Sequence, residues 1–232
     1  MQPELQPIQA GTPQSSYALA QHRVLRNTYW LLAISLIPTA IGAAIGTNID
    51  FGFMRASPML SFFAVLAVFY GWIFAIEKNR NSALGVGLLL GFTLFLGILL
   101  GPLFQRVLGF ANGVQLVMMA AGGTAATFFV MAGIATTTKR DLSALGSFLS
   151  VGVIVIMLAV VANAFFQNMT AHLVILAGFV LLSSLIMLWQ VNNIVRGGET
   201  NYVSATLTLY VSIYNLFSSL LQLLGIFGGN RD

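Results

Sequence analysis

Long apolar stretches separated by short polar connections run along the chain from residue 28 to residue 227. A hydrocarbon core about 30 Å thick requires roughly 20 mostly apolar residues in helical form. None of the stretches that reach this length contains Asp, Glu, Lys or Arg. The pattern therefore predicts an all-α integral membrane protein, a bundle of seven transmembrane helices. The predicted spans are Thr28–Thr47, Pro58–Ile76, Ser82–Phe104, Val114–Thr136, Ser143–Phe166, Leu173–Ile194 and Ser204–Phe227.

The composition removes the main alternatives to this architecture. Charged residues make up only 7% of the chain, and apolar residues make up 58%. A soluble domain of this size would need more charge to cover its surface, which excludes soluble enzymes and secreted modules. The ten Lys and Arg residues are scattered, so nucleic acid is not an expected partner. A membrane β-barrel would instead show segments of about ten residues with alternating polarity.

The ends of the chain differ in composition from the membrane domain. Residues 1–27 are rich in Pro, Gln and Ser and predict a disordered cytoplasmic tail, residues 28–227 form the membrane domain, and residues 228–232 form a short C-terminal tail. Lys and Arg residues favour the cytoplasmic side, which sets the orientation. One side holds Arg23, Arg26, Lys78, Arg80, Lys139, Arg140 and Arg196, and the other holds Arg55, Arg106 and Arg231. This predicts a cytoplasmic N-terminus and an external C-terminus, unless the last and most polar span re-enters.

The last span carries one periodic polar pattern. Its polar residues recur at spacings of four and three, which places them on one face of a helix. They are Thr208, Ser212, Asn215, Ser219 and Gln222. Because lipid offers these groups no partners, the face should turn toward the bundle interior or a wet cavity. Two interpretations remain open: hydrogen bonds between helices, at about 0.6 kcal/mol per contact, or the lining of a path for a solute or ion.

Further polar residues lie near the ends of other spans. Gln190 and Asn192 close the sixth span and are followed by the interfacial charges Arg196 and Glu199. Amide oxygens bind cations only weakly, and no carboxylate lies in any span, so no metal site is predicted. We interpret Asn163 and His172, near the turn between the fifth and sixth spans, as structural residues.

Small-residue pairs and enzyme motifs give little further information. The GxxxG spacing occurs at Gly42/Gly46, Gly87/Gly91 and Gly97/Gly101, but several chance matches are expected among 23 glycines. No HExxH, P-loop or GxSxG motif is present, and no cofactor is expected. The chain is therefore predicted not to be an enzyme.

Several stretches resemble one known family. These are HRVLRNTYWLL before and into the first span, LLGPLF, GGTAATFF, TTTKRDLSALG and the closing NNIVRGGETNYVSATLTLYVSIYNLFSSLLQLLG. They resemble the Bax inhibitor-1 (transmembrane BAX inhibitor motif) proteins, in particular the bacterial YccA-like branch. The resemblance implies six helices around a central seventh, in the bacterial cytoplasmic (inner) membrane. It also implies a substrate and modulator of the membrane-embedded ATP-dependent protease FtsH, with the tail that starts at Met1, Gln2, Pro3 and Glu4 as the handle that the protease grasps.

Other members of the resembled family are proposed Ca²⁺ leak channels, gated by a pair of aspartates on the last two helices. Gln190 and Ser212 stand at those two positions here, and neither side chain ionises. The resemblance thus supports a non-enzymatic regulator of a membrane protease as the first hypothesis. The alternative is a Ca²⁺ or H⁺ leak channel or transporter lined by the polar face of the last helix.

Overall fold

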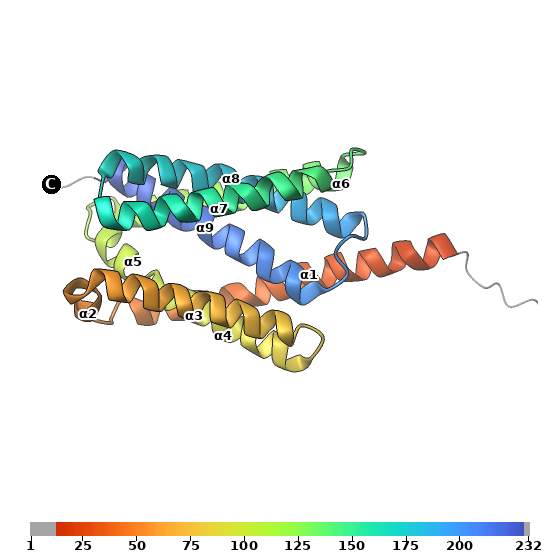
Figure 1. The fold of residues 1–232 in the computed structure, drawn as a ribbon, viewed down its shortest axis with the longest axis horizontal. Helices are drawn as coiled ribbons and strands as arrows, with labels where there is room; N and C mark the ends of the chain where they lie inside the picture. Colours follow the sequence, from red (N-terminus) through yellow and green to blue (C-terminus); the bar gives the residue numbers. More distant parts are fainter. Residues whose placement is uncertain (1–12, 230–232) are drawn as a thin grey trace, which may run out of the picture.

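The computed structural model describes residues 13–229, and within that range all regular elements are helices (Figure 1). In chain order they are α1 (Pro13–Gly46), α2 (Gly52–Ala56), α3 (Pro58–Lys78), α4 (Ala83–Leu99), α5 (Gly101–Leu108), α6 (Gly113–Thr137), α7 (Ser143–Phe166), α8 (Met169–Val195) and α9 (Tyr202–Gly228). The helix pair α4 and α5 is interrupted only at Leu100 and counts as one span, Ala83–Leu108.

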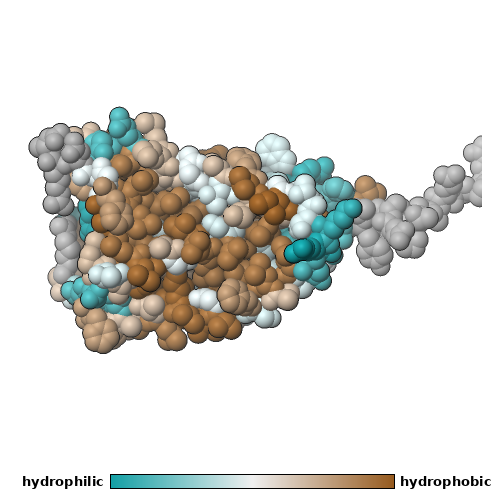
Figure 2. Space-filling model, turned by 90° about the horizontal axis from the view of Figure 1, so that it is seen from above, coloured by the Kyte–Doolittle hydropathy of each residue, from teal (hydrophilic) through white to brown (hydrophobic). Residues whose placement is uncertain are grey.

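Seven of the described helical segments are long and apolar enough to cross a membrane. Figure 2 shows the consequence on the surface: hydrophobic side chains cover the middle of the molecule, and hydrophilic side chains gather toward its ends. Exposed apolar side chains such as Phe74, Phe129 and Phe166 belong to this surface, and an apolar surface of this extent is typical of a protein that lipid surrounds. The prediction of an all-α membrane protein with seven spans is confirmed.

Helix α9 is the central helix of the bundle. It packs against α1, α3, α4, α5, α6 and α8, while α7 packs against α8 on the outside. Its side chains Leu209 and Leu216 are completely buried. The hydroxyl oxygen of Tyr210 lies 2.6 Å from Thr39 Oγ1 on α1 and 3.3 Å from the carbonyl oxygen of Thr93 on α4. The central position of the seventh span is therefore confirmed, and five of the other six spans pack on it, whereas α7 packs on α8.

The crossing of α1 and α4 depends on glycines. A methyl group built on Gly42 would overlap the carbonyl oxygen of Leu94, and one on Gly97 would overlap the carbonyl oxygen of Thr39. The next pair along the crossing, Gly46 and Gly101, is equally close, because a methyl group on Gly101 would overlap the Gly46 carbonyl oxygen. The GxxxG pairs Gly42/Gly46 and Gly97/Gly101, which chance alone could have explained in the sequence, thus let the two backbones touch. Small residues have this effect between membrane helices.

The start of α1 corrects the prediction for the N-terminal region. The helix begins at Pro13, so the expectation of disorder through residue 27 is wrong for residues 13–27. Proline fits the first position of a helix, and the following Ala, Leu, Gln and Arg residues favour helix. Extending a helix that the membrane already stabilises needs no new nucleation. Residues 1–12, including Met1, Gln2, Pro3 and Glu4, and residues 230–232 lie outside the described residues.

Candidate functional site

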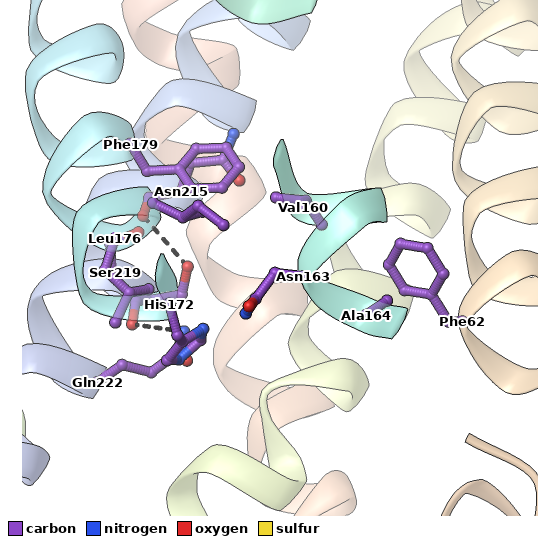
Figure 3. Close-up of a pocket in the computed structure, with 12 residues that line it drawn as sticks. Phe62, Val160, Asn163, Ala164, His172, Leu176, Phe179, Asn215, Ser219 and Gln222 are labelled. Carbon is purple, nitrogen blue, oxygen red and sulfur yellow. Dashed lines mark hydrogen bonds between the residues drawn. The ribbon is translucent and has the colours of Figure 1, made fainter. Parts of the chain in front are cut away.

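A cavity of about 300 Å³ separates α7 from the central helix. It exists because α7 packs on α8 and stands away from α9, and Phe62 of α3 borders the remaining side (Figure 3). Six of its twelve lining residues have polar side chains and six have apolar side chains. The lining residues are Phe62, Val160, Asn163, Ala164, His172, Ile175, Leu176, Phe179, Asn215, Ser218, Ser219 and Gln222.

The second half of α9 supplies most of the polar wall. Asn215, Ser219 and Gln222, three members of the predicted polar face, line the cavity together with Ser218. Two local hydrogen bonds, drawn in Figure 3, satisfy part of this wall: Ser218 Oγ donates to the Asn215 carbonyl oxygen and Gln222 Nε2 donates to the Ser218 carbonyl oxygen, both at 3.2 Å. Part of the polar face thus lines a cavity. The interpretation of this face as the lining of a path for a solute or ion requires such a cavity.

The first half of the predicted face behaves differently. Ser212 is only 3% exposed, and its hydroxyl donates to the Thr208 carbonyl oxygen at 2.8 Å, one helical turn earlier. A serine bonded to its own helix needs neither water nor a ligand. Thr208 and Ser212 do not line the cavity, so the five residues of the face are divided between a cavity wall and a packed interior.

The predicted residues of the sixth span lie at the other end of the bundle. Gln190 and Asn192 belong to the last two turns of α8, beside the start of α9. Asn192 Nδ2 donates to the Ala135 carbonyl oxygen of α6 at 3.3 Å. Gln190 is 2% exposed, and its Nε2 has no hydrogen-bond partner among the described residues. The structure therefore does not bring these two amides to the cavity of α9.

The interfacial charges organise the loops at that same end. The Arg196 guanidinium donates to the carbonyl oxygen of Lys139, and Glu199 accepts a hydrogen bond from the Asn201 N–H at 2.8 Å. In the loop before α7, hydrogen bonds from the hydroxyl and then from the N–H of Ser143, together with the charge of Arg196, hold the pKa of Asp141 below its usual range. Through Arg196, the end of α8 is therefore joined to the loop between α6 and α7, and Glu199 holds the residue that precedes α9.

Sequence reasoning missed Asn163 and His172 as cavity residues. Asn163 lies in the last turn of α7 and His172 in the first turn of α8, so the turn between these helices brings both to the level of Gln222. Asn163 Oδ1 accepts from the Asn168 N–H at 3.0 Å, and Asn168 in turn caps α8 by accepting from the Ala171 N–H. The signal that would have found them is their shared position at one end of a helical hairpin.

The chemistry of the cavity is that of hydrogen bonding. No carboxylate is among its lining residues. Within the part of the chain that the structure describes, no group of three or more His, Cys, Asp or Glu residues is placed to hold a metal ion. The wall offers amides, hydroxyls and one imidazole, which bind water, neutral polar groups or anions.

A protein family described as "Inhibitor of apoptosis-promoting Bax1" matches residues 21–229. The chain belongs to this family. Among its relatives, the Escherichia coli K12 protein named "Modulator of FtsH protease YccA" is 43% identical over 214 residues, which cover 92% of this chain and 94% of the relative. An uncharacterized protein of Neisseria meningitidis serogroup A is 47% identical over 212 residues, 90% of this chain and 93% of its own length. The family inferred from sequence motifs is thereby confirmed.

Proposed function

We propose that this protein is an inner-membrane modulator of the FtsH protease, and not itself an enzyme. The observation that carries the proposal is the 43% identity to the Escherichia coli modulator of FtsH, because it extends over 94% of that relative. A second Escherichia coli relative of the same identity is named "Inner membrane protein YccA". Similarity over nearly the whole length supports a shared mode of action rather than one shared motif.

The N-terminal region supplies the physical basis for contact with a protease that pulls on its substrates. Helix α1 starts at Pro13, and its first turns project beyond the ends of the neighbouring helices in Figure 1. We infer that residues 1–12, which precede this projection, are the segment that the protease grips. The seven-to-three distribution of Lys and Arg supports a cytoplasmic N-terminus and an external C-terminus. This orientation would put residues 1–12 on the cytoplasmic side.

Co-purification tests whether the chain and the protease associate. The full-length protein, tagged at its C-terminus, is expressed together with a proteolytically inactive FtsH and extracted in mild detergent. We expect FtsH to be retained with the tagged chain well above the amount retained by a tagged seven-helix membrane protein of another family. Equal retention by both proteins would contradict the proposal.

A cation leak is a second candidate, favoured by the polar wall of Asn215, Ser219 and Gln222. Two observations weigh against it: the cavity lining holds no carboxylate, and Ser212 is buried and bonded within its own helix. We therefore expect Ca²⁺ entry into proteoliposomes to equal that of protein-free liposomes. Entry that exceeded this background and fell in Asn215→Leu would establish the leak instead.

A further inference from the structure

The cavity beside α9 continues into two further hollows toward the end of the bundle where α9 ends. A hollow of about 530 Å³ shares His172 and Gln222 with the cavity, and another of about 300 Å³ shares Ser218 and Gln222 with it. Both of these hollows are also lined by Arg106 of α5. Gln222 lines all three, so they adjoin its side chain from different sides, and we refer to the three together as the α9 hollow.

The described residues place charge of one sign in the α9 hollow. Arg106 is the only Arg, Lys, Asp or Glu among the described residues that line it, and its side chain is exposed. Among the described residues, no carboxylate lies within ion-pair distance of Arg106. The His172 imidazole and the Asn215 side-chain amide likewise form no hydrogen bond with described residues. A guanidinium beside unused polar groups is complementary to a phosphate.

The opposite wall of the hollow is apolar and belongs to helices that face lipid. Phe179 and Leu176 of α8 and Val160 of α7 form this wall, and Phe62 of α3 stands across from Ala164 of α7 (Figure 3). Helices α3 and α7 pack on other helices, α3 on α4 and α9 and α7 on α8. Phe62 and Ala164 therefore line the cavity from two helices that pack on different partners, and a lipid chain that entered between them would reach the hollow. A hydrocarbon chain fits such a wall, whereas a small water-soluble anion gains nothing from it.

We propose that the α9 hollow binds one anionic phospholipid. Its phosphate lies between Arg106, His172 and Gln222, and one acyl chain extends along Phe179, Leu176 and Val160, the apolar side of the cavity. A guanidinium at the end of a membrane bundle lies at the depth of the lipid phosphates, to which it can donate two hydrogen bonds at once. The site lies at the end of the bundle opposite to the start of α1, and none of its residues belongs to the segment 1–12 proposed to contact FtsH.

Native mass spectrometry of the purified full-length protein tests this proposal with phosphatidylglycerol and phosphatidylcholine as probes. We expect one retained phosphatidylglycerol per chain and weaker retention of phosphatidylcholine. Arg106→Gln should reduce phosphatidylglycerol affinity about tenfold, the factor for one charge-assisted hydrogen bond. The matched control Arg140→Gln, an exposed arginine at the other end of the bundle, should leave the affinity unchanged. Equal affinity in both variants would overturn the proposal.

A second pair of variants separates a lipid from a free anion. Ala164→Trp fills the part of the hollow assigned to the acyl chain, whereas Ala162→Trp places the same side chain on the exposed face of α7. Only the first should abolish retention of phosphatidylglycerol, and millimolar glycerol 3-phosphate should not displace the lipid. Displacement by glycerol 3-phosphate, with no effect of Ala164→Trp, would overturn the lipid assignment and show a site for soluble phosphate.

Discussion

Gly97→Ala is expected to destabilise the bundle strongly, although it adds only one methyl group. The added carbon would overlap the carbonyl oxygen of Thr39, and it would also lie 3.0 Å from the Thr39 carbonyl carbon and Cα. These atoms are backbone, so no side-chain rotation relieves the overlap and α1 must move away from α4. Overpacking of this kind costs about 1–3 kcal/mol, and more where backbone must shift. Thermal unfolding in detergent should show a clearly lower midpoint than that of the unsubstituted protein.

The same helix offers a matched control for this substitution. Gly87 lies on α4 and is exposed, and a methyl group built on it meets no atom within 4 Å. Gly87→Ala should leave the unfolding midpoint unchanged or raise it slightly, because alanine favours helix over glycine by roughly 0.5–1 kcal/mol. If the Gly97→Ala and Gly87→Ala variants unfold at the same temperature, the backbones of α1 and α4 do not touch at Gly97.

Deletion of residues 2–12 is expected to lengthen the half-life of the protein several-fold in cells that contain FtsH. A protease that pulls needs a segment to grip, and the deletion leaves only the helix that begins at Pro13 ahead of the first span. A pulse-chase measurement compares the shortened chain with the full-length chain. The matched control replaces residues 2–12 by a scrambled sequence of the same composition, which should be degraded as fast as the full-length chain. If the deletion variant were degraded as fast as the full-length chain, residues 1–12 would not be the segment that FtsH grips.

The fold was largely predictable because the membrane imposes a length on each helix. Ser143–Phe166, predicted as the fifth span, has the same bounds as α7 in the structure. The start of α1 was not predicted, because the charged residues Arg23 and Arg26 before Thr28 mark the edge of the membrane and not the end of a helix. Likewise, the spacing of Gly97 and Gly101 did not reveal that their partners are Gly42 and Gly46, since that depends on how two helices cross.

The candidate site was predictable only where a residue belonged to a repeating pattern. Asn215, Ser219 and Gln222 share one face of α9, and their spacing alone places them there. Asn163 and His172 are single polar residues on two other helices, and only the turn between α7 and α8 brings them to the same cavity. Polarity alone did not distinguish Ser212, which bonds to its own helix, from Ser219, which lines the cavity.

The most direct test of the proposed function measures how fast FtsH degrades another membrane protein. Purified FtsH and a short-lived reporter substrate are reconstituted in liposomes with ATP, with or without a molar excess of this chain. We expect the full-length chain to slow degradation of the reporter, whereas an equal amount of an unrelated seven-helix protein should not. A reporter that disappears at the same rate with and without this chain would contradict the proposal that it modulates FtsH.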